Sequence, residues 1–312
     1  KKKEQKLVPQ HKRSFWGNLC YYKEYYLMLI PGILFFLVFC YGPMYGLVIA
    51  FQDYYPLKGV TGSKMVGLKH FRRFIDMTVF WNVFKNTLLL SFYNLLVNFP
   101  IPIIVALMVN EVKEGMFKKT MQTVTYAPHF ISTVIVCSML TLFLSPSAGF
   151  VNKIIELFGG EAVNFMANPD NFKHIYVWSN TWQHTGWSSI IYVAALSSVD
   201  PALHESAVVD GATRMQRIIH INLPSLAPTI VIQLILCCGS ILVSDFEKVL
   251  ILQKPAIMEA ADVLSTYVYR IGIQQAQFSL SSAIGLFNSL VNFIVLITIN
   301  KMCRRIGDTS LW

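Results

Sequence analysis

The sequence predicts an all-α membrane protein with six transmembrane helices. Of its 312 residues, 54% are apolar and only 14% are charged, whereas soluble domains carry about 25% charged residues. A helix needs about 20 apolar residues to cross the ~30 Å hydrocarbon layer of a membrane. Six runs of this length lack Asp, Glu, Lys and Arg, and they cover residues 25–51, 87–110, 120–144, 175–199, 225–244 and 280–300.

The basic residues predict the orientation of these helices. The basic segment 1–24 precedes a run too long for a signal-peptide core and has no small-residue cleavage site, so we expect the first run to be a retained span. If the N-terminus is cytoplasmic, Lys and Arg are more frequent inside than outside, as the positive-inside rule requires. We therefore expect the tail, residues 301–312, to be cytoplasmic as well. The net charge of +9 then comes from membrane flanks and predicts no nucleic acid partner.

Three connectors, residues 52–86, 145–174 and 245–279, are expected on the outer side. In the first, "GLKHFRRFIDMTVFWNVFKN" mixes basic and aromatic residues, which predicts a helix on the membrane interface with its apolar side chains in the lipid. In the other two, "FVNKIIELFG" and "MEAADVLSTYVYRIGIQQ" have helical spacing. We expect these stretches to form short helices that cap the outer face.

The sequence predicts no metal site and no source of energy within the chain. Six cysteines without CxxC spacing and seven histidines without HExxH spacing do not form a ligand pattern. Ion-coupled carriers need titratable groups inside the membrane, but the six runs contain no carboxylate, Lys or Arg. Energy for active transport would therefore come from another subunit, and without one transport would be passive.

Neutral polar and aromatic side chains in the runs are candidates for a substrate pathway. Residues four apart share a helix face, and aromatic rings beside amides suit sugars, whose C–H faces stack while their hydroxyls form hydrogen bonds. The same residue types also join neighbouring helices and anchor helices at interfaces. The candidates are Asn94, Asn98, Trp182, Gln183, Trp187, Tyr192, Asn288 and Asn292.

Residues 200–224 interrupt the apolar pattern on the cytoplasmic side. Asp200 can cap a helix, Pro201 fits its first position and Gly211 can end it. "TRMQ", from Thr213, fits a capping box that begins a second helix, and we expect this helix to end before Pro224. Helices this short need a surface to pack against, which is either the groove of a partner protein or the membrane surface.

This segment resembles the EAA signature of bacterial ABC importer permeases. The signature reads E-A-A-x-x-D-G-A, then eight residues, then I-x-L-P. "GLKHF", "KNTLLLS" and the final "TSLW" extend the resemblance over almost the whole chain, to carbohydrate permeases of the LplB and YteP group. Ser206 replaces the first alanine, and the other matching residues are Glu205, Ala207, Asp210, Gly211, Ala212, Ile221, Leu223 and Pro224.

The resemblance implies the type I ABC importer permease fold in the bacterial inner membrane, with residues 200–224 as a cytoplasmic coupling helix pair. A second, different permease subunit would complete the pathway, an extracellular solute-binding protein would deliver an oligosaccharide, and two ABC ATPase subunits would bind ATP and Mg²⁺. The chain itself would need no cofactor and would not be an enzyme. The residues that contact the ATPase would be Glu205, Ser206, Ala207, Asp210, Gly211, Ala212, Leu223 and Pro224.

Two alternatives remain open from the sequence. An ABC permease for an amino acid, a peptide or phosphate would carry the same signature. A carrier or channel outside the ABC class is the other alternative, although the sequence has neither an inverted repeat nor charges within the runs, which disfavours a carrier. A channel would have no need of the EAA segment.

Overall fold

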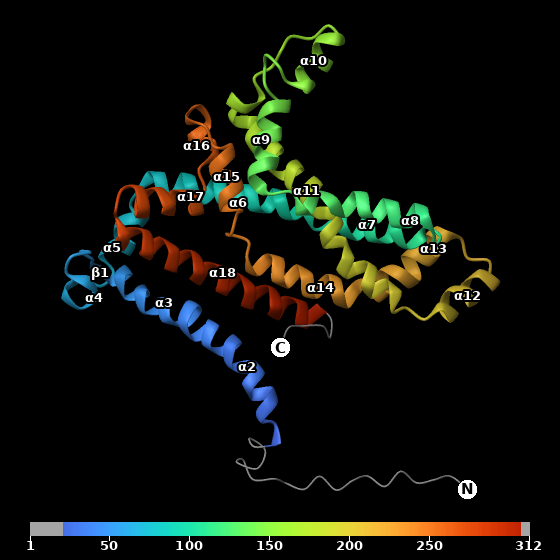
Figure 1. The fold of residues 1–312 in the computed structure, drawn as a ribbon, viewed down its shortest axis with the longest axis horizontal. Coiled ribbons are helices and arrows are strands. Elements are labelled where there is room, and N and C mark those ends of the chain that lie inside the picture. The colour runs from blue at the N-terminus through green and yellow to red at the C-terminus, as the bar shows by residue number, and fades with distance from the viewer. Residues whose placement is uncertain (1–20, 307–312) are drawn as a thin grey trace.

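The computed structural model describes residues 21–306, so most of the predicted N-terminal segment and half of the predicted tail lie outside the described residues. Helices make up nearly all of the described chain (Figure 1). Within that part, the single sheet is an antiparallel pair in which β1 (Gln52–Asp53) lies against β2 (Lys64–Met65). The prediction of an all-α protein is confirmed.

The helices fall into two halves along the chain. The first half contains α2 Lys23–Phe35, η1 Phe36–Tyr41, α3 Gly42–Met44, η2 Tyr45–Phe51, α4 Gly59–Gly62, α5 Lys69–Ile75, α6 Thr78–Asn98, α7 Pro100–Glu111, α8 Met116–Tyr126, η3 Ala127–Phe130 and α9 Thr133–Phe143. The second half contains α10 Phe150–Leu157, η4 Phe165–Ala167, α11 Pro169–Ser197, α12 Pro201–Val209, α13 Arg214–Arg217, η5 Ile218–Asn222, α14 Leu223–Gly239, α15 Phe246–Leu252, η6 Pro255–Ile257, α16 Met258–Ala261, α17 Leu264–Tyr269, η7 Arg270–Gln274 and α18 Phe278–Ile306.

Four continuous helices among the described residues are long and apolar enough to cross a membrane. They are Lys23–Phe51, Thr78–Glu111, Arg214–Gly239 and Phe278–Arg305, and a bent pair formed by α8–η3 and α9 gives a fifth if it counts as one span. The helices Thr78–Glu111 and Arg214–Gly239 begin nine and eleven residues before the runs at 87 and 225. Each extension carries Lys or Arg, which can stay in water at the end of a span.

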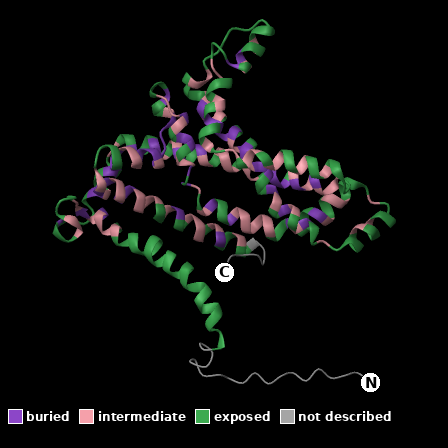
Figure 2. Cartoon of the chain, viewed as in Figure 1, coloured by how far each residue is buried: buried purple, intermediate pink, exposed green. Residues whose placement is uncertain are grey.

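The first of these helices packs on the bundle only through its last part, η2, where Ala50 is buried. No residue from Tyr21 to Met44 is buried or even half-buried, and Figure 2 shows α2 exposed along its length. The helix runs through Pro31 without ending, and six residues with π-helical hydrogen bonds, Phe36–Tyr41, precede Pro43. The apolar surface of residues 23–44 therefore faces lipid or another subunit and not this bundle.

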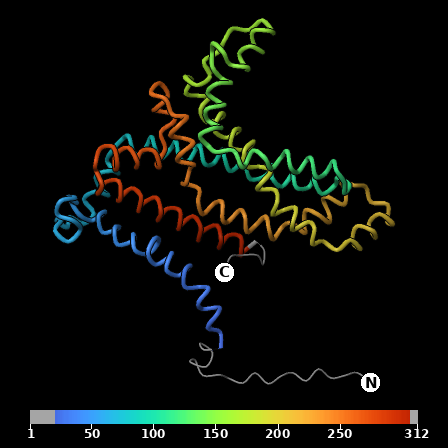
Figure 3. The backbone as a smooth tube through the Cα atoms, viewed as in Figure 1, coloured from blue at the N-terminus to red at the C-terminus, as the bar shows by residue number. Residues whose placement is uncertain are grey.

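The third predicted run is not one straight helix. The chain turns by 96° between Phe130 and Thr133, where Ile131 and Ser132 are extended. Pro128 lies in the last turn before this break and lacks a backbone N–H, and Ser132 caps the next helix by accepting a hydrogen bond from the backbone N–H of Ile135. As a result, α9 and α10 project away from the long helices of the bundle (Figure 3).

Helix α11, which corresponds to the fourth run, is longer than predicted. It begins after the Asn168 cap and extends over 29 residues to Ser197. Helix α11 is not among the helices whose composition alone identifies them as membrane spans. The reason is its content of Ser, Thr, Asn and Gln, several of which are buried within the bundle. Helix α11 contacts α6, α7, α8 and α14.

The prediction that the apolar side chains of the first connector enter lipid is wrong for its central aromatic residues. The stretch divides into α5 and the start of α6, and Phe74 and Phe80 are both 0% exposed. Their ring centroids are 4.7 Å apart, and each also packs against Phe287 of α18. Burial against other rings is therefore available within the chain, and these side chains do not enter lipid. Of the aromatic residues predicted to do so, Trp81 is exposed.

Three buried clusters hold the bundle together and position the site. One joins η2, α5, α6, α17 and α18 at the end near β1. A second joins α6, α9, α11 and α15, and a third joins α7, α11 and α14. Helix α11 contributes to both the second and the third cluster. The part of α11 that lies between these two clusters is therefore held in place at both of its ends.

A candidate coupling segment and a polar cavity

Helix α12 is fixed at both ends by hydrogen bonds within its own segment. At its start, the Asp200 carboxylate accepts from the backbone N–H of Ala202 at 2.9 Å, and Pro201 occupies the first helical position. At its end, Gly211 has a φ of +78°. The backbone N–H groups of Gly211 and Ala212 donate to the carbonyls of Val208 and Ala207 at 3.0 and 2.8 Å, which is the Schellman arrangement of a helix end.

The predicted capping box is also confirmed. The backbone N–H of Gln216 donates to Thr213 Oγ1 at 3.4 Å, and the backbone N–H of Thr213 donates to Gln216 Oε1 at 2.7 Å. These two reciprocal bonds start α13. Only Ala212 lies between Gly211 and this cap, so α12 and α13 are joined by a very short turn.

The prediction that the second helix ends before Pro224 is wrong. Helix α13 continues through the π-helical turn η5 into α14, and the helix from Arg214 to Gly239 is continuous over 26 residues. In the π turn the backbone N–H of Leu223 donates to the carbonyl of Ile218, five residues back. This wider turn occurs immediately before Pro224, where a regular α-helical turn would meet the proline ring.

The outer surface of this segment is exposed and partly apolar. Leu203, Val208 and Met215 are 51%, 54% and 63% exposed, and the described residues show no ion pair for Glu205. A shallow groove of about 320 Å³ runs along the junction of the two helices. Its lining comprises Ala207, Asp210, Gly211, Ala212, Gln216, Arg217, His220 and Ile221. Helix α12 lies at one end of the molecule (Figure 1), so nothing in the described chain covers it.

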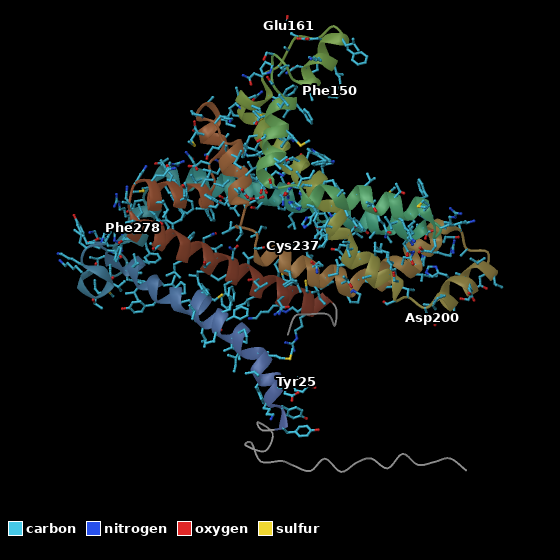
Figure 4. All side chains as sticks on the ribbon, in the orientation of Figure 1. Tyr25, Phe150, Glu161, Asp200, Cys237 and Phe278 are labelled. Atoms are coloured by element: carbon cyan, nitrogen blue, oxygen red, sulfur yellow. The ribbon has the colours of Figure 1, made fainter. Side chains whose placement is uncertain are left out.

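A polar cavity of about 160 Å³ lies between α6, α11 and the end of α14. Two of the predicted pathway residues line it: Asn98 Nδ2 donates to Asn94 Oδ1 at 2.7 Å, and Asn180 Nδ2 of α11 donates to the same oxygen at 3.1 Å. Cys237, another lining residue, lies near the middle of the molecule, far from Asp200 (Figure 4). The other polar lining residues, which the sequence interpretation missed, are Ser91, Tyr176, Ser240 and Ser244.

The structure does not bring the remaining predicted pathway residues into this cavity. Trp182 lines a separate apolar groove of about 480 Å³ between α9 and α11, and the ring of Trp187 stacks on His129 with centroids 4.5 Å apart. Tyr192 is buried in the third cluster. Gln183 is also buried, and it donates from Nε2 to the carbonyl of Ile131, where the third span breaks.

The two asparagines predicted on the sixth span differ in what they contact. Asn292 Oδ1 accepts from the backbone N–H of Leu242 at 3.0 Å and thereby holds the chain that follows α14. Asn288 is half-buried on the same helix and is absent from the cavity lining. Asn292 thus has a structural contact, and the cavity is formed instead by residues of α6, α11 and the end of α14.

A buried lysine behind the cavity was missed from the sequence. Lys248 of α15 is 0% exposed; its Nζ donates to Gln183 Oε1 at 3.3 Å and lies 5.9 Å from the centre of the Tyr176 ring. Burial lowers the pKa of the Lys248 ammonium group from 10.5 to about 8. By sequence, Lys248 belongs to a predicted outer connector, residues 245–279. The only sequence feature that indicates its burial is that it is a single basic residue within the apolar stretch "KVLIL".

Comparison with known proteins identifies the family. No family model matches the chain. The polygalacturonan/rhamnogalacturonan transport system permease protein YteP of Bacillus subtilis (strain 168) is 44% identical over 93% of this chain and 90% of its own length. This chain belongs to the sugar ABC transporter permeases. Protein LplB of the same organism is 40% identical over 93% of this permease and 91% of its own length.

Solved structures agree with this assignment. A permease chain in the crystal structure of a bacterial alginate ABC transporter, in complex with an alginate pentasaccharide-bound periplasmic protein, is 42% identical with a TM-score of 0.88. That comparison covers 96% of this permease and 100% of the other chain. A second structure, of a bacterial ABC transporter that imports the acidic polysaccharide alginate, has a TM-score of 0.86 at 43% identity, over 94% and 99% of the two chains. The predicted resemblance is confirmed, and the chain is a transport subunit and not an enzyme.

Proposed function

We propose that this permease forms half of a pathway for oligosaccharides and that α12 couples it to a cytoplasmic ATPase. The observation that carries this proposal is the cavity at Asn94 and Asn98, which offers neutral amides and hydroxyls next to a tyrosine ring. Such groups suit sugars, because hydroxyls take hydrogen bonds while ring C–H faces lie on aromatic surfaces. The relative YteP, a permease of a polygalacturonan/rhamnogalacturonan transport system, supports a saccharide substrate.

The size of the cavity supports a pathway shared with a second permease. Pockets for small ligands usually have volumes of about 300–1,000 Å³, whereas this one has about 160 Å³. A second permease subunit, expected to be a different chain, would complete the site. The exposed part of the first span, residues 23–44, leaves a large apolar surface for contacts with that subunit or with lipid.

We infer a six-span topology with both termini in the cytoplasm. The four apolar helices, the bent pair α8–η3 and α9, and the long α11 would supply the six spans. This count places α12 on the cytoplasmic side, in agreement with the distribution of basic residues. An extracellular solute-binding protein would then deliver the sugar at the opposite end, near β1 and α5.

The proposed coupling surface combines the EAA signature with an uncovered helix. Glu205, Ser206 and Ala207 lie on α12 itself. Asp210, Gly211 and Ala212 form the turn, and Leu223 and Pro224 begin α14. Two ATPase subunits, one on each permease, would bind ATP and Mg²⁺. Their closure would move α12 and tilt the spans between outward-open and inward-open states.

Reconstitution of the complete importer tests this function. With its ATPase, second permease and binding protein in nanodiscs, we expect sugar-loaded binding protein to stimulate ATP hydrolysis. Substitution Asn94→Leu should lower sugar uptake while the ATPase stays bound, since Asn94 accepts hydrogen bonds from both Asn98 and Asn180. Asn288→Leu is the matched control, because Asn288 does not line the cavity. Asn152→Leu, on the distant α10, is unsuitable as a control because Asn152 forms hydrogen bonds that hold its own loop. If no ATPase co-purifies in mild detergent, the coupling assignment is wrong.

A further inference from the structure

Lys248 is a buried cation directly behind the wall of the polar cavity. Its ammonium group lies 5.9 Å from the centre of the Tyr176 ring, and Tyr176 is part of the cavity lining. Ser244, four residues earlier in the chain and just before α15, lines the same cavity. Leu90 does so too, and it packs in the same cluster as Val249. The lysine therefore does not touch the cavity, but only one layer of side chains separates the two.

No carboxylate forms an ion pair with Lys248 within the described residues. Its hydrogen-bond acceptor is the neutral amide oxygen of Gln183. The carboxylate of Asp245 caps α15 by accepting from the backbone N–H of Lys248 at 3.2 Å, and Glu247 is exposed. The charge of the lysine is thus offset at a distance by Asp245 and is not neutralised by contact.

The cavity itself contains no ionisable carboxylate or basic side chain: its polar lining consists of serines, asparagines, a tyrosine and a cysteine. A charge in a poorly solvated interior acts over a longer range than the same charge in water. With Lys248 protonated, its positive charge acts on the cavity against one nearby carboxylate, that of Asp245, whose backbone N–H donates to the Tyr176 hydroxyl. The lining itself contributes no negative charge. A neutral sugar would not respond to the charge of Lys248, whereas a sugar carboxylate would be attracted by it.

We propose that Lys248 makes this permease select oligosaccharides that carry carboxylates, by acting through the Tyr176 wall on substrate in the cavity. This inference rests on the proposed oligosaccharide pathway and names the class of sugar for the same site. Lys248 is therefore a positioning residue. It is buried and does not contact the substrate, so its charge acts on the substrate from a distance. Two unit charges about 12 Å apart at an effective dielectric constant of about 20 favour binding by about ten-fold.

The test compares a substrate that carries carboxylates with its uncharged methyl ester. Proteoliposomes containing the complete importer would take up either trigalacturonate or its methyl ester, with the same binding protein in every reaction. The substitution Lys248→Met removes the charge and keeps an apolar stem, Lys248→Arg keeps the charge, and Gln183→Glu neutralises the charge by an added carboxylate. We expect the ratio of acid uptake to ester uptake to fall about ten-fold in Lys248→Met and Gln183→Glu and to stay near the wild-type ratio in Lys248→Arg.

The outcomes separate this inference from the proposed function. Equal loss of both substrates in Lys248→Met would show that the lysine is only structural, and an unchanged ratio in both neutralised variants would overturn the inference. If the wild-type importer takes up neither compound but another, neutral oligosaccharide, the charge selection is wrong and the permease function stands. If loaded binding protein fails to stimulate ATP hydrolysis with any oligosaccharide, the proposed function itself fails.

Discussion

Replacement of Gly211 should uncouple the permease from its ATPase. Gly211 has a φ of +78°, and a Cβ placed on it would meet no atom within 4 Å. The cost of a side chain is therefore backbone strain alone, about 1–2 kcal/mol for an ordinary L-residue in this region. That corresponds to about a 5- to 30-fold smaller population of the turn. A β-branched residue is penalised further, because its side chain restricts the backbone.

The effect is measured as ATP hydrolysis stimulated by loaded binding protein, together with the amount of ATPase that co-purifies. We expect Gly211→Ala to lower stimulation several-fold and Gly211→Val to abolish it, while Gly211→Asn, which tolerates positive φ, retains most of it. Ser197→Ala, on the neighbouring α11 and outside the coupling surface, is the control, since the Ser197 hydroxyl donates within its own helix to the carbonyl of Val193. Wild-type stimulation in Gly211→Val would refute a requirement for this turn.

Three further predictions concern stability in detergent. Asn292→Leu should lower the free energy of unfolding by about 1–3 kcal/mol because the Leu242 N–H is left unpaired, and Thr87→Val should do the same for the Leu264 N–H; an unchanged thermal midpoint would contradict either. Between pH 8 and 10.5 the unfolded chain binds more protons at Lys248 than the folded chain, so wild-type stability should rise with pH there. Lys248→Met should lose that rise, and identical pH profiles would count against a buried ammonium.

Features encoded by neighbouring residues were predictable from the sequence. The caps at Asp200 and Thr213 and the turn at Gly211 depend on side chains and backbone within a few residues, so their pattern is visible without a fold. The first and last spans were also located well, because their apolar runs are long and uninterrupted. The pairing of Asn94 with Asn98 followed from helical spacing alone.

Features that depend on distant contacts were not predictable. Toward the N-terminus, the charge-free runs of the second and fifth predicted spans can extend no further than Lys85 and Arg217. The helices themselves begin several residues earlier in the chain. The break at Ile131 is held by Gln183, which is 52 residues away, and the buried position of Lys248 requires α15 to fold back against α9 and α11. For the same reason, the aromatic and amide residues grouped along α11 do not form one site, since they point to different neighbours around the helix.

The continuous helix from Arg214 to Gly239 gives the molecule a lever. At 1.5 Å per residue, its 26 residues measure ~39 Å. One end begins beside the Gly211 turn, and the other reaches Cys237, at the cavity. A tilt of about 10° around one end would displace the other by about 7 Å over this length. A small rotation imposed at the cytoplasmic end would therefore be enough to open or close a passage for one sugar unit, without any rearrangement inside the helix.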